Sequence, residues 1–227
     1  MNIGFRILNR NRAMSADVVA RFAALPVANV SDSMSRMTAA GPHLRKMHRD
    51  GVLAGPALTV KSRPGDNLML HKAIDMAQPG DVIVVDAGGD TTNALMGELM
   101  LAHALNRGVA GFVLNGAIRD VDAFWDTNLP VYAAGVTHRG PYKDGPGEIN
   151  VPVAIDGMVI HPGDLILGDS DGVLAIPFDE AEAIYARTIA KQEAETKQMA
   201  AIRAGTNNRA WVDETLRRLG CDIPAGI

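Results

Sequence analysis

The fold is decided by one stretch of the chain, residues 97–120, which reads GELMLAHALNRGVAGFVLNGAIRD. Its first half predicts an amphipathic helix, because apolar residues recur there at close to helical spacing, namely Leu99, Leu101, Ala102 and Leu105. Residues 106–108 end this helix, since Gly108 supplies a left-handed cap and Arg107 places a positive charge near the C-terminus. The short apolar run 109–114 then predicts a strand that is covered on both faces.

Two opposite charges, Arg119 and Asp120, follow a predicted turn at residues 115–116. In open α/β sheets, ligands bind beyond the carboxyl ends of the strands. Two interpretations are open at this point. In the first, Asp120 begins a helix and Arg119 forms a surface ion pair. In the second, a right-handed β-α-β arrangement brings Glu98 and Asp120 to one crevice, where free amides of residues 98–100 form an anion site.

The composition is that of an ordinary globular protein, with 47% hydrophobic and 21% charged residues in a chain of 227. The net charge of −4 argues against a general nucleic-acid or anionic-membrane surface. No apolar run approaches the ~20 residues that a membrane helix requires. The single cysteine, Cys221, excludes an internal disulfide and a cysteine-rich zinc site. We therefore expect a cytoplasmic protein without nucleic-acid or membrane partners.

Three segments are predicted along the chain: an N-terminal arm at 1–14, an α/β domain at 15–177 and a helical extension at 178–227. Within the domain, residues 79–89 and 162–172 repeat a Pro-Gly-Asp turn that feeds an apolar strand ending in aspartate and glycine. The extension begins with a long polar helix, predicted over 179–204 and too polar for burial by its own domain. A shorter helix is predicted over 208–219.

The sequence excludes several classes of enzyme. It contains no glycine-rich nucleotide loop after a strand, no nucleophile elbow and no histidine pair with zinc spacing. Carboxylates, one well-placed arginine and loop backbone remain, and these suit a hard cation such as Mg²⁺ or Mn²⁺. A helix predicted over 66–77 carries His71 and Lys72, which we expect to be solvated or hydrogen-bonded rather than catalytic. The polar segment 142–147, with Lys143, is either a plain surface loop or a determinant of specificity.

One motif of the chain resembles the acidic-X20-Arg-Asp signature of the RraA-like family: Glu98 is followed, after twenty residues, by Arg119-Asp120. The GELM around Glu98, the GGD at 88–90 and the GDSDG at 168–172 are similar to the same family, and the likeness covers about residues 27–205. The family includes class II 4-hydroxy-4-methyl-2-oxoglutarate/4-carboxy-4-hydroxy-2-oxoadipate aldolases, and also regulators of ribonuclease activity. The resemblance implies a three-layer β/β/α swivelling-domain fold with a long C-terminal helix.

The same resemblance implies a metal-dependent lyase that releases pyruvate from a 4-hydroxy-2-oxo acid and also decarboxylates oxaloacetate. The alternative is a non-catalytic protein-binding regulator of ribonuclease activity. In the enzyme, Asp120 would bind Mg²⁺ or Mn²⁺ directly, and Glu98 would act through metal-bound water. Arg119 would hold the keto oxygen as it becomes an enolate. The substrate carboxylate would be bound at Gly97 and by the amides of Leu99 and Met100. The chain departs from the aldolases at Glu98, where they usually have aspartate.

The resemblance also implies an assembly. In RraA-like aldolases, an acidic residue of the C-terminal helix reaches the metal of a neighbouring subunit. Counted back from Gly205, the matching position is Glu195, whereas Glu193 is out of register. We therefore expect a homotrimer or a dimer of trimers, in which Glu195 completes the metal site of the next subunit.

Overall fold

The computed structural model describes residues 2–224, and its two compact units divide between Thr188 and Ile189. The first unit contains, in chain order, β1 (Phe5–Ile7), α1 (Ala16–Ala23), α2 (Val27–Ser33), β2 (Arg45–Lys46), β3 (Leu53–Ser62), α3 (Leu68–Met76), β4 (Val82–Asp86), β5 (Ala94–Met96), α4 (Glu98–Asn106), β6 (Gly111–Ile118), α5 (Val121–Thr127), β7 (Val131–Val136), β8 (Gly147–Ile149), β9 (Val153–Ile155), β10 (Met158–Ile160), β11 (Leu165–Asp169), β12 (Gly172–Ile176) and a 3₁₀ turn at Phe178–Glu180. The long helix α6 (Ala181–Arg203) spans the division, and the second unit contains α7 (Ala210–Arg218).

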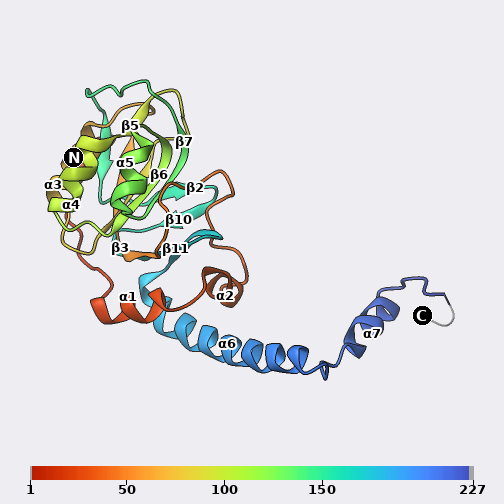
Figure 1. The fold of residues 1–227 in the computed structure, drawn as a ribbon. Coiled ribbons are helices and arrows are strands. Elements are labelled where there is room, and N and C mark those ends of the chain that lie inside the picture. The colour runs from red at the N-terminus through yellow and green to blue at the C-terminus, as the bar shows by residue number, and fades with distance from the viewer. Residues whose placement is uncertain (1, 225–227) are drawn as a thin grey trace. The chain divides into compact units, whose positions relative to one another are not determined.

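A mixed sheet forms the centre of the first unit (Figure 1). Its strands lie in the order β1-β8-β3-β4-β6-β7-β2, and β5 adds to β6. The neighbours β3, β4, β6 and β7 are parallel, whereas β11 and β12 form an antiparallel pair joined to β3. The separate hairpin β9–β10 contacts β3, β4 and β12 and thereby adds a second β layer. With the helices, this gives the three-layer β/β/α arrangement that the resemblance implies.

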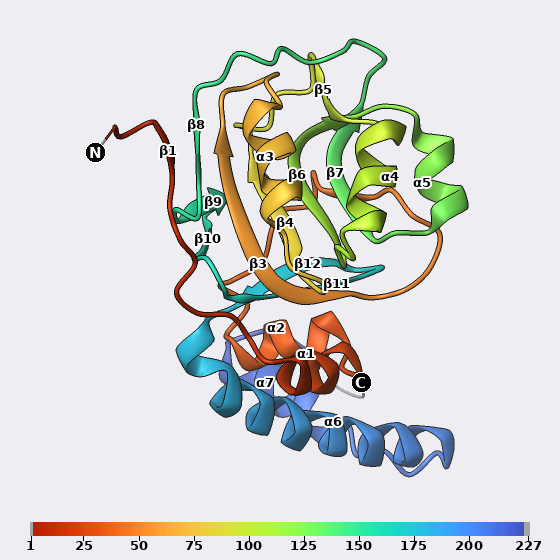
Figure 2. The same cartoon turned by 90° about the vertical axis from the view of Figure 1, so that its left-hand side faces the viewer.

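The helices α3, α4 and α5 cover one face of the sheet (Figure 2). Their buried side chains and those of the strands beneath form one continuous apolar core, which includes Leu70, Ile74, Leu101, Phe112 and Leu114. Burial of this apolar surface is the main favourable contribution to folding. The core therefore fixes where α4 begins, directly above the carboxyl ends of β5 and β6.

The buried face of α4 differs from the predicted one. Met100, Leu101 and Ala104 are buried, whereas Leu99 is 85% exposed and Leu105 is exposed as well. The predicted apolar face through Leu99, Ala102 and Leu105 is therefore wrong, and only Leu101 belongs to both faces. The helix carries apolar residues on most of its sides, so its spacing alone could not select the face that packs.

The predicted turn at Asn115 and Gly116 is also wrong, because β6 continues through both residues to Ile118. The Asn115 amide donates to the Asp86 carboxylate on the neighbouring strand at 3.1 Å, which holds this polar residue within the sheet. A side chain at Gly116 would come within 2.5 Å of Leu95. Here glycine permits close packing of two strands instead of reversing the chain.

The two Pro-Gly-Asp segments form matching turns, as predicted. The Asp81 carboxylate accepts a hydrogen bond from the Gln78 amide at 2.9 Å, and the Asp164 carboxylate accepts one from the His161 amide at 2.8 Å. Gly80 and the equivalent glycine of the second turn both have a φ of +90°, which favours glycine. Each turn leads into an apolar strand, β4 or β11. The Pro-Gly-Asp sequence alone was therefore sufficient to predict both turns.

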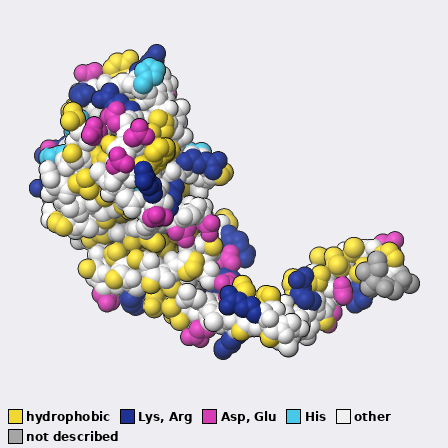
Figure 3. All heavy atoms as spheres, in the orientation of Figure 1, with side chains coloured by type: hydrophobic (Ala, Val, Ile, Leu, Met, Phe, Trp, Pro, Cys, Tyr) yellow, Lys and Arg dark blue, Asp and Glu magenta, His cyan; other side chains and the backbone are white. Residues whose placement is uncertain are grey.

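The second unit is a polar helical extension. None of its described residues is buried. The prediction that the helix over 179–204 is too polar for burial by its own domain holds for this part only, because Ala181, Ile184 and Thr188 in the first turns of α6 are buried. None of the helices described is both long and apolar enough to cross a membrane. On the face drawn in Figure 3, basic and acidic side chains are interspersed, as the small net charge leads one to expect.

Candidate functional site

The start of α4 and the end of β6 bring Glu98 and Asp120 together. The Asp120 carboxylate accepts a hydrogen bond from the backbone amide of Glu98 at 3.0 Å. Asp120 has a left-handed backbone (φ 55°) and directly precedes α5, but its side chain makes no capping bond to that helix. Both open interpretations therefore hold in part, because Asp120 begins one helix while its carboxylate holds the N-terminus of another.

Gly97 makes this approach of α4 to β6 possible. A Cβ atom at Gly97 would come within 2.4 Å of the Asp120 carboxylate and within 3.0 Å of Arg119 Cγ. The backbone at Gly97 is extended, so the requirement is for space and not for an unusual conformation. The first residue of the decisive stretch is thus glycine because any side chain would displace Arg119 and Asp120.

The amides at the start of α4 are less free than predicted. The amide of Glu98 donates to Asp120, and that of Met100 donates to the Gly97 carbonyl at 3.1 Å. Within the described chain, the Leu99 amide alone of these three has no hydrogen-bond partner. An anion at this helix terminus would therefore find one open N–H group together with the partial positive charge of the helix end.

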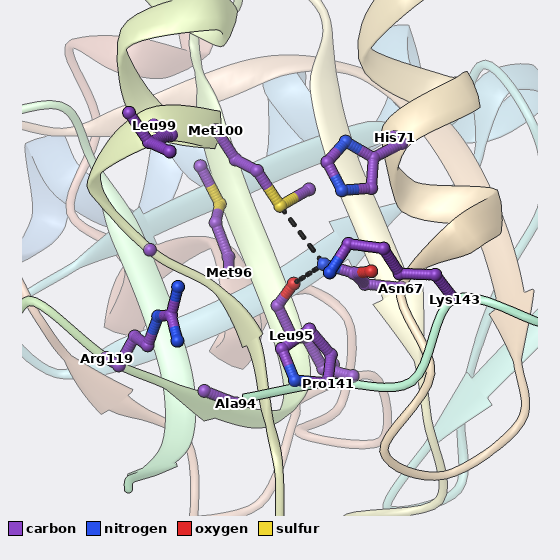
Figure 4. A pocket seen from close by; sticks show the side chains of 11 residues that line it. Asn67, His71, Ala94, Leu95, Met96, Leu99, Met100, Arg119, Pro141 and Lys143 are labelled. Atoms are coloured by element: carbon purple, nitrogen blue, oxygen red, sulfur yellow. Dashed lines mark hydrogen bonds between the residues drawn. The ribbon is translucent and has the colours of Figure 1, made fainter. Parts of the chain in front are cut away.

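A cavity of about 120 Å³ opens beside this terminus (Figure 4). Arg119 lies on one side of it, and Asn67, His71 and Lys143 lie on the opposite side. Its remaining lining comes from Ala94, Leu95, Met96, Gly97, Leu99, Met100 and Pro141. The Arg119 Nε atom is 3.6 Å from the Asp120 carboxylate, and its side chain is 43% exposed. The pocket thus carries positive charge at both ends and apolar side chains between them.

Asn67 lines the pocket and was not recognised in the sequence. It is only 2% exposed, and its Nδ2 atom donates to the Leu95 carbonyl at 2.9 Å and contacts Met100 Sδ at 3.2 Å. Its Oδ1 atom is buried and has no hydrogen-bond partner among the described residues. The sequence offered a single signal here, a polar residue before a helical run, and that signal indicates only where a helix starts.

His71 is partly exposed and also lines the pocket, next to Lys143. Burial lowers the pKa of His71, and the nearby positive charge of Lys143 lowers it further. Both effects favour the uncharged imidazole at neutral pH. Lys72, its neighbour on α3, is exposed, as predicted.

The segment that carries Lys143 is held firmly and is not a plain surface loop. The buried Asp66 carboxylate accepts hydrogen bonds from the amides of Asp144 at 2.8 Å and Gly145 at 2.9 Å. The backbone N–H of Asn67 donates a hydrogen bond to the Tyr142 carbonyl at 3.0 Å. These bonds fix the segment against the start of α3 and thereby keep Lys143 at the pocket.

The carboxylates of one chain suit a hard divalent cation but do not form a complete cage. Among residues 2–224, no cluster of three histidine, cysteine, aspartate or glutamate side chains could hold a metal. The Asp120 carboxylate lies against Gly97 at the edge of the pocket, and it uses only one of its two oxygens in hydrogen bonds within the described chain. Glu98 is the first residue of α4 and is exposed there. One or two carboxylates plus water is the set that Mg²⁺ ordinarily accepts. Glu195 lies on α6 in the second unit, where it pairs with Lys191 at 3.0 Å.

The chain is similar to several known proteins in sequence and in fold. The family described as Aldolase/RraA matches residues 27–175. A protein of Halalkalibacterium halodurans named "putative 4-hydroxy-4-methyl-2-oxoglutarate aldolase" is 41% identical, over 78% of this chain and 84% of its own. A Thermus thermophilus protein named 4-hydroxy-4-methyl-2-oxoglutarate aldolase is 34% identical, over 49% of this chain and 68% of its own. The solved structure of the RNA-processing inhibitor RraA from Thermus thermophilus superposes with a TM-score of 0.62 at 29% identity, over 67% of this chain and 92% of that one.

Proposed function

The chain belongs to the RraA-like family, and on that premise we propose that it is a divalent-metal-dependent lyase. It cleaves a 4-hydroxy-2-oxo acid to pyruvate by a retro-aldol reaction and also decarboxylates oxaloacetate. One observation carries the proposal: Arg119 and the N-terminus of α4 face the same small pocket, with Asp120 anchored between them. The names of the aldolase relatives support a lyase-type role.

In this proposal, the 2-oxo acid end of the substrate lies at the Arg119 side of the pocket. The open Leu99 amide and the positive end of α4 bind its carboxylate. The Arg119 guanidinium faces the keto oxygen, where negative charge develops during the reaction. Positive groups that are held in place before the reaction stabilise this charge without having to reorganise.

Cleavage breaks the C3–C4 bond of the substrate. The 4-hydroxyl group loses its proton to solvent and becomes a carbonyl, while the bonding electron pair moves toward C3 and the keto oxygen. The pyruvate enolate then takes up a proton at C3. Loss of carbon dioxide from oxaloacetate produces the same enolate, so a site that stabilises the enolate serves both reactions.

Asp120 is the residue that would hold the metal directly, and Glu98 would act through bound water. A divalent cation at this place supplies Lewis-acid polarisation of the keto group, in the same direction as the charge of Arg119. The extra methylene of Glu98, relative to the aspartate usual in the aldolases, is compatible with contact through water. The candidate cations are Mg²⁺ and Mn²⁺.

The direct test is an assay of pyruvate release. Purified protein is incubated with several 4-hydroxy-2-oxo acids and with oxaloacetate, with Mg²⁺ or after treatment with a chelator. We expect pyruvate from at least one hydroxy acid and from oxaloacetate, with the activity lost on chelation and restored by added Mg²⁺. No release from any of them would instead favour the regulator, for which the RraA likeness gives precedent. Full activity after chelation would contradict the metal.

We further propose that the active unit is a homotrimer or a dimer of trimers and that Glu195 completes the metal site of a neighbouring subunit. The proposal explains why one described chain has fewer than three candidate ligands together. It also gives a role to a helical extension whose described residues are all at least partly exposed.

Subunit mixing tests this assembly. Asp120→Ala and Glu195→Ala proteins should each be inactive, but subunit exchange at equal amounts should restore up to about a quarter of the wild-type activity, since a random quarter of interfaces combine both intact groups. A mixture of Asp120→Ala with Arg119→Ala is the matched control and should stay inactive, because both defects affect the same subunit's part of the site. A monomeric mass in solution, or full activity of Glu195→Ala alone, would contradict the proposal.

A further inference from the structure

His71 is a titratable residue in the wall of the candidate active site, and neither the proposed metal nor Arg119 uses it. It lies one turn into α3, where its backbone N–H donates to the Asn67 carbonyl at 3.0 Å. Its helix neighbours Leu70 and Ile74 are fully buried in the apolar core. The helix therefore holds His71 at a fixed place, on the side of the pocket opposite Arg119 (Figure 4).

The imidazole ring of His71 is available to a ligand in this pocket. The residue is partly exposed, and no described residue forms a hydrogen bond with its ring. In contrast, the rings of His43, His48 and His103 each have a hydrogen-bond partner. A neutral imidazole has one nitrogen that accepts a hydrogen bond and one that donates. The chain itself occupies neither of these positions at His71.

Among the side chains that line the pocket, His71 is the one suited to take up a proton at neutral pH. Arg119 and Lys143 carry hydrogen-bond donors and no acceptor, and the other lining side chains are apolar or a neutral amide. Burial lowers the pKa of His71, and the positive charge of Lys143 lowers it further. Asp75 of the same helix opposes this shift of the pKa, whereas His103 of α4 adds to it. The imidazole is therefore uncharged at pH 7 and has a free lone pair.

We propose that His71 is the general base that takes the proton of the substrate's 4-hydroxyl group during cleavage. This inference rests on the proposed lyase function. In that function the keto carbon, C2, lies at Arg119, and C4 is two carbons further along the substrate. The substrate therefore extends from Arg119 across the pocket, and its hydroxyl group lies toward the wall that carries His71.

The proton transfer needs no further reactant. A ring nitrogen of His71 takes the hydroxyl proton, the C4–O bond becomes a carbonyl, and the C3–C4 bond breaks. The bonding electron pair moves to C3 and on to the keto oxygen, which faces Arg119. The imidazolium then releases its proton to solvent and the enolate takes up a proton at C3, so the neutral base is restored for the next turnover.

The two reactions proposed for this site separate the base from its other groups. Oxaloacetate has no 4-hydroxyl group, so its decarboxylation requires no base at His71. Cleavage should decrease about tenfold per pH unit once the imidazole is protonated, and the lowered pKa of His71 places this decrease below about pH 6.5. Protonation of a metal-binding carboxylate lowers both reactions together. In wild-type protein, the ratio of kcat/KM for cleavage to kcat/KM for decarboxylation should therefore fall as the pH falls.

The substitution His71→Gln removes the base but keeps a polar side chain. We expect kcat/KM for a cleaved 4-hydroxy-2-oxo acid to fall about 10²-fold or more, while kcat/KM for oxaloacetate changes little. The ratio of the two values should also no longer depend on pH. Lys72→Gln is the matched control, because Lys72 is the next residue of α3, is exposed and does not line the pocket. Both reactions of Lys72→Gln should stay at the wild-type level.

Added imidazole provides a second readout, which a merely structural role of His71 would not affect. The substitution His71→Ala leaves space at the pocket wall. Imidazole at pH 7 should restore part of the cleavage by His71→Ala, increasingly with its concentration, and should leave decarboxylation unchanged. Thermal melts show whether the variants fold. If neither variant folds, the pH dependence of the ratio in wild-type protein decides the question.

Failure of this inference can be told apart from failure of the proposed function. Equal losses of both reactions in His71→Gln, or a ratio in wild-type protein that does not change with pH, would overturn the role of His71. If wild-type protein cleaves no 4-hydroxy-2-oxo acid at all, the proposed function fails. If wild-type protein cleaves one and His71→Gln cleaves it equally well, only the inference about His71 fails.

Discussion

Replacing Arg119 with alanine is expected to lower kcat for pyruvate release by about 10²–10³-fold, the usual cost of removing one donor that stabilises a developing oxyanion. The guanidinium lies at the pocket and is fixed beside Asp120, with Nε 3.6 Å from its carboxylate. Because the Arg119 side chain is 43% exposed, its removal leaves no large cavity in the core, and the melting temperature should change little. Steady-state kinetics and a thermal melt measure the two quantities.

Arg119→Lys is the matched control for this substitution. Lysine keeps the positive charge but loses the planar fork that binds two oxygens at once. We expect Arg119→Lys to retain more activity than Arg119→Ala while remaining well below wild type. The assignment of Arg119 would be wrong if Arg119→Ala kept the wild-type kcat on its best substrate.

Local signals predicted the parts of this fold that depend on neighbouring residues. Gly108 ends α4 with a φ of +71°, and both Pro-Gly-Asp turns feed strands. Each of these features needs only a few consecutive residues, so the sequence contains the necessary information. The spacing of Glu98 and Arg119-Asp120 correctly predicted that Glu98 and Asp120 lie close together. A helix and the strand after it return the chain to the same edge of a sheet, so this prediction also needed only consecutive residues.

The sequence failed where a residue's role depends on a distant partner. Asn115 and Gly116 have the composition of a turn, but Asp86 and Leu95 from other strands make them part of β6. The pocket residue Asn67 is positioned by the Leu95 carbonyl, 28 residues away along the chain. No periodicity reveals such pairs, because they form only when the sheet assembles.

Replacing Asp120 is the second change for which we expect a large loss of activity. Two substitutions separate its proposed role as a metal ligand from its role as the acceptor for the Glu98 amide. Asp120→Ala removes both the negative charge and the acceptor for the Glu98 amide. Asp120→Asn removes the charge but keeps an oxygen that can accept from that amide. If the carboxylate holds the metal, each variant should lose about 10²-fold or more in kcat, because the polarisation of the keto group is lost in both.

Stability should distinguish the two Asp120 variants although activity does not. In wild-type protein, the carboxylate satisfies the Glu98 amide and places a negative charge at the N-terminus of α4. Asp120→Ala loses both contributions, and such a change typically costs about 1 kcal/mol of helix or protein stability. Asp120→Asn keeps the hydrogen bond, so its free energy of unfolding in urea should lie between those of wild type and Asp120→Ala.

Metal binding connects these two measurements. Calorimetric titration with Mn²⁺ should detect binding to wild-type protein and little or none to either Asp120 variant. If Asp120→Asn bound Mn²⁺ and turned over like wild type, the role of Asp120 would be limited to holding the start of α4. If both variants lose the metal while only Asp120→Ala is clearly destabilised, the carboxylate has two separable roles: its hydrogen bond builds the site, and its charge binds the cation.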